Sequence, residues 1–270
     1  MSSDNLEVKY EHLRSILEAM ERVVVAFSGG VDSSLLLRVA VDALSPQNVL
    51  AVIGDSESLP RRELAVARSL AADIGVPYHV IESGELQDPA YRANPQDRCY
   101  FCKRALFAKL TRVARKQGFA VVLDGSNADD LGDWRPGLRA AREWGVRSPL
   151  QEANLTKAEV RELSRRLGLP TADKPAMACL ASRLSYGTPI TKEALGSIEA
   201  AEETLRELGI GQVRVRLHGD LARIEILPED FSRLLVAPVR AQVLAALSGL
   251  GFRYLCLDLQ GYRSGSMNPA

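Results

Sequence analysis

The sequence predicts an α/β fold, in which a doubly wound parallel sheet is followed by a second, smaller α+β domain. In residues 1–170, short β-branched runs alternate with segments of helical period, which is the pattern of a parallel sheet covered by helices. The length of 270 residues suits about two domains, and an irregular stretch that contains prolines separates them. We therefore place the first domain at residues 1–175 and the second at residues 176–270.

The first domain begins with a helical pattern over residues 6–22, where apolar residues recur every three or four positions. A short β-branched run over residues 23–27 predicts a strand buried on both faces. Further runs of strand type cover residues 49–53, 78–81 and 121–124. Segments of helical period cover residues 35–44, 61–74, 101–117 and 157–167. Ligands of such sheets bind beyond the carboxyl ends of the strands, so the segments that follow the strands are the informative ones.

The second domain follows a stop signal at Gly168 and Pro170 and an irregular stretch that reaches Pro189. We expect a helix over residues 192–208 and two alternating strands over 213–218 and 221–227. Two further helices and a last strand are expected over residues 228–235, 238–250 and 253–257. This succession predicts a small α+β domain.

The composition excludes several classes of protein. Hydrophobic residues make up 46% and charged residues 25%, as in ordinary globular domains. The 34 basic residues balance the 34 acidic ones, and this balance disfavours a dedicated nucleic-acid binder. No apolar stretch approaches the roughly 20 residues that span a bilayer, and residues 1–15 lack the pattern of a signal peptide. We expect a cytoplasmic protein, in which the four cysteines bind metal or act in catalysis rather than form disulfides.

The segment that joins the first predicted strand to the following helix has the composition of a phosphate-binding loop. Its candidate ligands are two glycines, three serines and an aspartate: Gly29, Gly30, Ser28, Ser33, Ser34 and Asp32. The glycines let backbone N–H groups approach a phosphate at the helix N-terminus, and the serines add hydroxyl donors. Asp32 could hold a Mg²⁺ ion that bridges phosphates. The alternative is a tight strand-to-helix turn that Ser33 caps.

Cys99 and Cys102 form a Cys-x-x-Cys pair at a predicted helix start. The helix dipole and the neighbouring Arg98, Lys103 and Arg104 should favour thiolates there. Two thiols are too few for a closed zinc or cluster site.

A third candidate thiol, Cys179, lies near the domain junction, with Arg183 close enough in sequence to hold an anion. Ordinary packing or chance is the alternative for Cys99, Cys102 and Cys179. Cys256 lies in an apolar predicted strand, and we expect it to be a core residue.

Arg214 and Arg216 alternate along a predicted strand, so both face the same side. With Ser182 and Arg183 they could clamp a phosphate. The alternative is that the two arginines are exposed and pair with Glu225 across the hairpin. Three acidic residues could position a substrate or a metal: Glu202, Glu203 and Glu225. A solvated helix face also explains the first two.

The motif Ser-Gly-Gly-x-Asp-Ser at residues 28–33, directly after a buried strand, resembles the PP-loop ATP pyrophosphatases, which are adenine nucleotide alpha hydrolase-like in fold. The resemblance implies that ATP is cleaved to AMP and pyrophosphate while a carbonyl or carboxylate oxygen is adenylated. It further implies nucleotide contacts after the second and fourth strands, at Gly54, Gly125 and Asp130. Asp129 and Asp130 could equally be a solvated loop pair.

The whole chain resembles the sulfur transferases of the LarE family, through residues 28–33, 97–103, 174–183 and 213–216. The resemblance implies that ATP adenylates a carboxylate of a pyridinium-3,5-dicarboxylate mononucleotide, pyrophosphate and then AMP leave, and a thiocarboxylate forms on the way to the nickel-pincer nucleotide cofactor. In one branch the cysteine at the position of Cys179 gives up its own sulfur. In the other branch three thiols hold a [4Fe–4S] cluster that carries a sulfide, and Cys99, Cys102 and Cys179 resemble that branch.

The resemblance thus implies an enzyme that uses ATP, Mg²⁺ held with the help of Asp32, and a [4Fe–4S] cluster. The substrate phosphate would be held by four residues: Ser182, Arg183, Arg214 and Arg216. The implied partners are the nucleotide substrate, a cysteine desulfurase or another sulfur donor, and further copies of the chain in a homo-oligomer, but no nucleic acid and no membrane.

Three alternatives stay open at this point. One is a synthetase that uses ammonia, in which all cysteine-to-serine variants would stay active. A PP-loop tRNA thiolation enzyme would need a basic surface, whereas residues 176–270 carry ten basic and ten acidic residues. A non-catalytic adenine-nucleotide or iron–sulfur binding protein would release no pyrophosphate.

Overall fold

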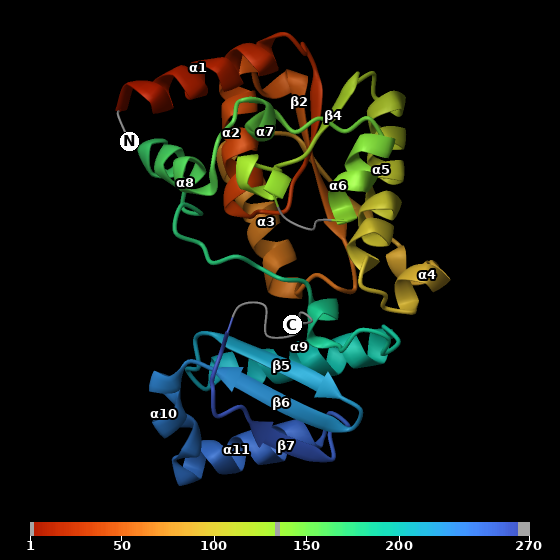
Figure 1. Cartoon of the computed structure of the whole chain (residues 1–270), viewed down its shortest axis with the longest axis vertical. Coiled ribbons are helices and arrows are strands. Elements are labelled where there is room, and N and C mark those ends of the chain that lie inside the picture. The colour runs from red at the N-terminus through yellow and green to blue at the C-terminus, as the bar shows by residue number, and fades with distance from the viewer. Residues whose placement is uncertain (1–2, 133–135, 264–270) are drawn as a thin grey trace. The chain divides into compact units, whose positions relative to one another are not determined.

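The computed structural model describes residues 3–132 and 136–263, and Figure 1 shows the chain as a cartoon. The chain divides into two compact units, which are described one at a time. The first comprises Met1–Asp88 and Asp97–Met177, and the second comprises Pro89–Gln96 and Ala178–Ala270. No pattern in the sequence indicates that Pro89–Gln96 belongs to the second unit.

The first unit contains four parallel strands in the order β3-β2-β1-β4. Their bounds are β1 Val23–Ala26, β2 Val49–Asp55, β3 Tyr78–Glu82 and β4 Val121–Leu123. Val23 of the central strand β1 pairs with Val49 on one side and with Val121 on the other. The predicted parallel sheet is confirmed, and each strand lies at its expected position in the sequence.

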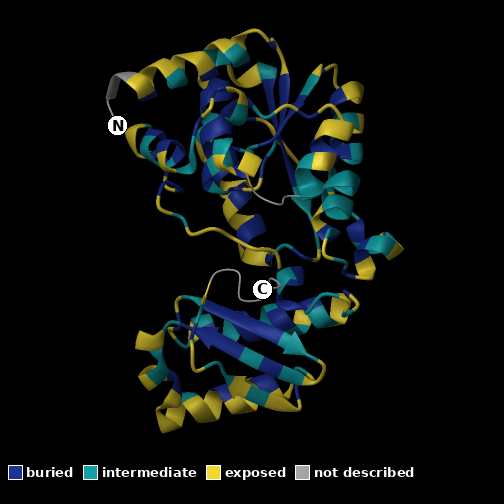
Figure 2. Cartoon of the chain, viewed as in Figure 1, coloured by how far each residue is buried: buried dark blue, intermediate teal, exposed yellow. Residues whose placement is uncertain are grey.

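Helices cover both faces of this sheet. Alternate residues of β1 therefore pack into two different hydrophobic cores. Val23 and Val25 belong to a core built with α1, α2, α3 and α8, whereas Val24 belongs to a core built with α5 and α6. The helices of the first unit are α1 Ser3–Glu18, α2 Val31–Leu44, α3 Arg61–Ile74, α5 Arg98–Lys116, α6 Pro136–Glu143, α7 Pro149–Glu152 and α8 Lys157–Arg166. Three of the four residues of β1 are buried and the fourth is half-buried, so β1 lies at the centre of a doubly wound unit, as predicted; Figure 2 colours the chain by this burial.

The sequence analysis missed α6 and several short helical turns. These turns are α4 Pro89–Arg92, α7, and the 3₁₀ turns η1 Pro46–Asn48, η2 Glu85–Gln87, η3 Ala128–Gly132 and η4 Leu180–Arg183. The 3₁₀ turn η5 Pro228–Asp230 lies within the helix expected over residues 228–235. A segment of three to five residues is too short to display a helical period. The α4 turn is held to the second unit by backbone bonds, since Ile190 donates its N–H to the carbonyl of Arg92 at 2.8 Å.

The second unit is an α+β fold with a three-stranded sheet in the order β5-β6-β7. Strands β5 Val213–His218 and β6 Leu221–Ile226 form an antiparallel hairpin, and β7 Tyr254–Leu257 runs parallel to β6. Its longer helices are α9 Lys192–Glu207, α10 Phe231–Leu235 and α11 Ala237–Ser248. One face of the sheet packs on α9 and α11 through apolar residues such as Val215 and Ile224. The other face carries Arg214, Arg216 and Glu225.

The expectation that Cys256 is a core residue is wrong, because its thiol is exposed. Strand β7 is an edge strand in which exposure alternates: Leu255 and Leu257 pack against the core, and Cys256 faces the opposite way. Cys256 pairs in register with Arg223 of β6, so it lies on the polar face. Apolar neighbours in sequence did not reveal which face of the strand the cysteine occupies.

Within the described ranges no single helix is long and apolar enough to cross a membrane, and the pair Pro228–Leu235 and Ala237–Ser248, bent by 88°, meets that test only when the two are taken together.

Candidate functional site

The turn between β1 and α2 is closed by its own serine hydroxyls. Ser28 Oγ and Ser33 Oγ lie 3.0 Å apart, and Ser33 Oγ donates to the carbonyl of Gly30 at 3.2 Å. The N-cap of α2 is Gly30, which provides no side-chain cap, so the alternative in which Ser33 caps the helix is wrong. The positive end of a 14-residue helix therefore meets a glycine turn, an arrangement suited to binding an anion.

Glycine is required in this turn at Gly29. Its φ of +66° lies in the left-handed region, and a Cβ atom there would lie 3.0 Å from the backbone of Ala67 in α3. Gly30 has a different surrounding, since the nearest atom to a Cβ there would be Ser28 Oγ at 3.3 Å. The loop backbone thus packs closely on α3 at one glycine only.

Asp32 is held by two residues from distant parts of the first unit. Asn127 Nδ2 donates to Asp32 Oδ1 at 3.1 Å, and the ammonium of Lys157 forms a close ion pair with the other carboxylate oxygen. Asn127 follows β4, and Lys157 begins α8. The structure thus orients the carboxylate that we expect to help hold Mg²⁺, and oxygen donors of this kind suit that ion.

The loop after β4 packs against the first turn of α2. A Cβ atom at Gly125 would lie 2.9 Å from the backbone nitrogen of Ser33, so the loop can approach only through glycine. Asp130 is buried and accepts a hydrogen bond from the N–H of Asn127 at 2.9 Å, whereas Asp129 is exposed. The solvated-pair alternative is therefore wrong for Asp130, which supports the loop that carries Asn127.

Two further predicted nucleotide contacts have packing roles in the structure. A Cβ atom at Gly54 would lie 2.9 Å from Leu106 of α5, so this glycine lets the helix approach β2. The side chain of Ser34 is fully buried in α2, and its hydroxyl has no hydrogen-bond partner among the described residues. Nucleotide binding at Gly54 and Ser34 stays a prediction.

Cys99 and Cys102 lie in the first turn of α5, where Cys99 is exposed and Cys102 is half-buried. Two of the three basic residues expected to favour thiolates have other contacts. Arg104 donates to Asp88 at 2.6 Å, and Lys103 Nζ lies 5.4 Å from the ring centroid of Phe107.

The three predicted sulfur-handling cysteines are divided between the units, since Cys99 and Cys102 belong to the first and Cys179 to the second. In the part of the chain that the structure describes, no group of three or more His, Cys, Asp or Glu side chains is arranged to hold a metal ion. Three accessible thiols are nevertheless a donor set of the right chemistry for an iron–sulfur cluster. The cluster stays a prediction.

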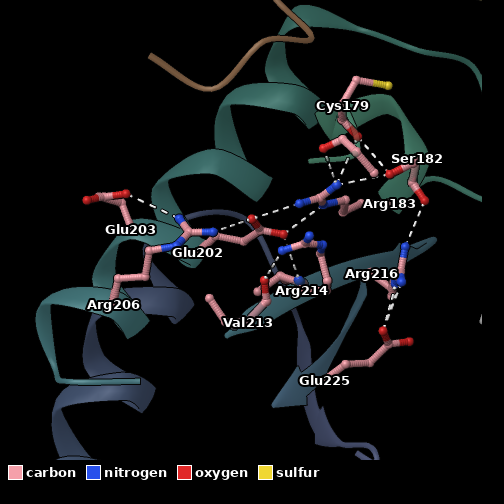
Figure 3. Close-up of polar contacts among 12 residues, drawn as sticks. Cys179, Ser182, Arg183, Glu202, Glu203, Arg206, Val213, Arg214, Arg216 and Glu225 are labelled. Carbon is pink, nitrogen blue, oxygen red and sulfur yellow. Dashed lines mark hydrogen bonds and ion pairs between the residues drawn. The ribbon is translucent and has the colours of Figure 1, made fainter. Parts of the chain in front are cut away.

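Cys179 is held through its carbonyl group while its thiol is exposed (Figure 3). The carbonyl oxygen accepts three hydrogen bonds: from the N–H of Ser182 at 3.0 Å, from Ser182 Oγ at 2.7 Å and from Arg183 Nη1 at 3.0 Å. The backbone at Cys179 is thus fixed by the turn that follows it, η4.

Arg183 is the residue that organises this turn, and it is fully buried. Its Nε and Nη2 donate to the two carboxylate oxygens of Glu202 at 2.8 and 3.1 Å, and its Nη1 also donates to the carbonyl of Ala178 at 2.8 Å. The prediction that Arg183 holds the substrate phosphate does not fit these contacts, because protein acceptors already engage its three nitrogens. Arg183 is a positioning residue for Cys179.

Glu202 of α9 is at the centre of a group of charged side chains, called the arginine cluster below, and is only 1% exposed. The members of the arginine cluster are Arg183, Glu202, Arg206, Arg214, Arg216 and Glu225. Besides Arg183, Glu202 accepts hydrogen bonds from Arg206 Nη2 at 2.8 Å and from the N–H of Val215 at 3.1 Å. Burial by itself would raise the pKa of Glu202, but the hydrogen bonds and charges of Arg183 and Arg206 outweigh it and lower the pKa below its ordinary value. The sequence analysis had a solvated helix face as one explanation for Glu202, and that explanation is wrong.

Arg216 and Arg214 differ in their partners although they share one face of β5. Arg216 donates to Glu225 at 2.9 and 3.1 Å and to the carbonyl of Ser182 at 2.9 Å; the pair with Glu225 is the expected alternative, but it is buried rather than exposed. Arg214 is also buried, donates to the carbonyl of Val213 at 2.9 Å and lies 5.3 Å from the ring of Tyr262. It forms no ion pair with any described residue.

Burial, followed by the charge of Arg183, lowers the pKa of Arg214 to about 10. A buried guanidinium without a counter-ion is stabilised when an anion binds. Of the four residues predicted to bind the substrate phosphate, Arg214 therefore has the strongest electrostatic reason to do so.

Comparison with known proteins gives relatives that cover the whole chain. The family model of NAD synthase matches residues 4–117. An uncharacterized protein of Synechocystis is 45% identical over 97% of this chain and 98% of its own length. The pyridinium-3,5-bisthiocarboxylic acid mononucleotide synthase of Lactiplantibacillus plantarum is 42% identical over 97% of this chain and 95% of its own. The chain therefore belongs to the LarE family of PP-loop enzymes, the family of that synthase.

Proposed function

We propose that this chain is an ATP-dependent sulfur transferase that converts a carboxylate of a pyridinium-3,5-dicarboxylate mononucleotide into a thiocarboxylate. One arrangement carries the proposal: Arg183 holds the exposed Cys179 through its carbonyl, and the charge of Arg183 also acts on the buried Arg214, which forms no ion pair with any described residue. A thiol nucleophile next to an anion site is what a phosphorylated acyl acceptor of sulfur requires. The kinship with the Lactiplantibacillus plantarum synthase names the substrate class.

In the first step the substrate carboxylate attacks the α-phosphorus of ATP, and pyrophosphate leaves. Ser28, Gly29, Gly30 and Ser33 would bind the phosphates at the N-terminus of α2, with Gly125 beside them. Asp32, oriented by Asn127, would hold a Mg²⁺ ion that neutralises charge on the phosphates. The product is an acyl adenylate, in which AMP is a good leaving group.

In the second step sulfur replaces AMP at the acyl carbon. Arg214, with Ser182 nearby in the predicted phosphate site, would hold the substrate phosphate, because its guanidinium forms no ion pair with any described residue. Arg216, like Arg183, already has all three nitrogens engaged by protein acceptors, so it would position this site rather than bind the phosphate. If Cys179 gives up its own sulfur, its thiolate displaces AMP to form a thioester. Loss of the Cα proton then breaks the Cβ–Sγ bond, which leaves the thiocarboxylate and dehydroalanine. A [4Fe–4S] cluster held by Cys99, Cys102 and Cys179 would instead supply a transferable sulfide and spare the cysteine.

The proposal is tested by following pyrophosphate and thiocarboxylate separately. We expect pyrophosphate release that depends on the pyridinium dicarboxylate nucleotide, and we expect Cys179→Ala to keep this release but form no thiocarboxylate. The matched control is Cys256→Ala, which removes an exposed thiol on the sheet of the same unit and should leave both products unchanged. Full thiocarboxylate formation by Cys179→Ala would overturn the role of this cysteine.

The source of the sulfur is tested on protein purified without oxygen. Iron and acid-labile sulfide near four of each per chain, lost in Cys99→Ala, would support the cluster. Absence of iron together with a mass loss of one H₂S after reaction would instead support sacrifice of Cys179. We expect a cysteine desulfurase or another donor to reload a cluster, the reaction to run in the cytoplasm, and the chain to assemble into a homo-oligomer, which sedimentation would measure.

A further inference from the structure

Lys174 places an ammonium group on the phosphate loop. Its Nζ donates to the carbonyl of Gly29 at 2.9 Å and forms an ion pair with Glu63 of α3 at 2.7 Å. The lysine side chain is 19% exposed, so it is largely enclosed but not sealed from solvent. Neither the phosphate-loop motif nor the cysteine pattern drew attention to this residue.

The backbone of Lys174 is fixed independently of its side chain. Arg161 of α8 donates to the carbonyl of Ala172 at 2.5 Å and to the carbonyl of Lys174 itself at 2.9 Å. The N–H of Lys174 donates to the carbonyl of Thr171 at 3.0 Å. A lysine whose backbone is fixed in this way loses less conformational entropy when it binds a ligand than a lysine on a mobile segment does.

The neighbours of Lys174 do not fully balance the charge of its ammonium group, so the group can still attract an anion. Glu63 has a second cationic neighbour, Arg62, at 3.6 Å, so its carboxylate is shared. The other contact of Lys174 is a neutral carbonyl, which a phosphate oxygen would replace with a charge-assisted hydrogen bond. Gly29 is itself a predicted phosphate ligand, so phosphates bound there would lie within reach of the ammonium.

We propose that Lys174 binds the β- and γ-phosphates of ATP and the pyrophosphate that departs. The ammonium turns from the carbonyl of Gly29 to phosphate oxygens when the nucleotide enters. This inference rests on the proposed function, because it assumes that the loop binds ATP. Lys174 precedes Cys179 by five residues, so the connecting segment would carry a phosphate ligand as well as the sulfur-handling cysteine.

Binding of three probes separates a phosphate ligand from a structural lysine. We expect Lys174→Met to weaken binding of ATP and of pyrophosphate by about 10- to 100-fold, the loss typical of a hydrogen bond to a charged group. Binding of AMP, which lacks the β- and γ-phosphates, should change less than about twofold. Lys174→Arg keeps the charge and should retain most of the pyrophosphate affinity, and Glu63→Gln should strengthen it by releasing the ammonium.

The matched control is Lys109→Met, since Lys109 Nζ also donates to a backbone carbonyl, that of Glu82 at 2.8 Å, away from the phosphate loop. It should alter none of the three affinities. Unchanged pyrophosphate binding in Lys174→Met would overturn the inference, and so would an equal loss of AMP binding, which would mean a disturbed loop. Failure of the unaltered chain to bind ATP would overturn the proposed function instead.

Discussion

The phosphate loop of the first unit and the arginine cluster of the second are held together in opposite ways. The loop is closed by hydroxyl and backbone contacts between residues no more than five positions apart, such as Ser28 with Ser33. In the cluster, Arg183 and Glu202 are 19 positions apart, and Arg216 and Ser182 are 34 apart. The turn of the loop is thus closed locally and depends on backbone shape, although Asn127, Lys157 and Lys174 also contact it from distant positions. The cluster is formed largely by tertiary contacts and depends on charge balance.

The largest loss of stability is expected in the arginine cluster, from the substitution that neutralises Glu202. Glu202→Gln leaves the buried Arg183 and the half-buried Arg206 without their shared carboxylate. Losing one partner of a buried pair costs about 3–5 kcal/mol of unfolding free energy. Urea denaturation measures this loss.

The control for this substitution is Glu203→Gln, because Glu203 also pairs with Arg206, at 3.2 Å, but its side chain is 47% exposed. A pair this exposed should contribute less than about 1 kcal/mol. Equal losses from the two variants would contradict the view that burial makes the cluster depend on charge.

A smaller effect is expected in the phosphate loop, where shape matters instead. Gly29→Ala places a side chain at a φ of +66° and against the backbone of Ala67. The left-handed conformation alone costs about 1–2 kcal/mol, and the contact adds to it. Gly75→Ala is the matched control, since Gly75 has a φ of +77° with open space around it. Gly29→Ala should lower the melting temperature and the ATP affinity more than Gly75→Ala does. Equal effects of the two substitutions would mean that close packing on α3 is unimportant.

The pH dependence of the cluster should be gradual. The pKa of Glu202 is lowered in the folded chain, so its contribution to stability is complete above the ordinary glutamate value of 4.5 and is lost as the pH falls through the folded value. The stability difference between the unaltered chain and Glu202→Gln should therefore be constant near pH 7. Below about pH 4 it should shrink by at most about 1.4 kcal/mol per pH unit. A difference that grew in acid would show that the sign is wrong.

The smallest effect is expected at Cys256. Because its thiol is exposed on the polar face of β7, Cys256→Ser should change the unfolding free energy by less than about 0.5 kcal/mol. Alkylation of the folded chain should also modify Cys256 readily. A loss above 1 kcal/mol, or protection from alkylation, would restore the original expectation of a core cysteine.

The difference between the two regions also explains which features could be predicted from the sequence and which could not. The strand at residues 23–27, the helix that follows and the phosphate loop between them could be predicted because their pattern is continuous in the chain. The role of Arg183 could not, because only the fold brings Glu202 to it and excludes water from both. Spacing did place Arg214 and Arg216 on one face of β5, but it could not show that only Arg216 has an ion pair among the described residues.

The hydrogen bonds that hold Cys179 have a consequence for the enzyme after it has reacted. Ser182 and Arg183 bind the carbonyl oxygen of residue 179 and leave its side chain alone. Removing the sulfur atom would therefore not loosen the turn, and a spent chain would keep the shape of a fresh one. If the cysteine is consumed, spent chains would go on capturing substrate in competition with fresh ones, so a cell would need to repair or destroy them.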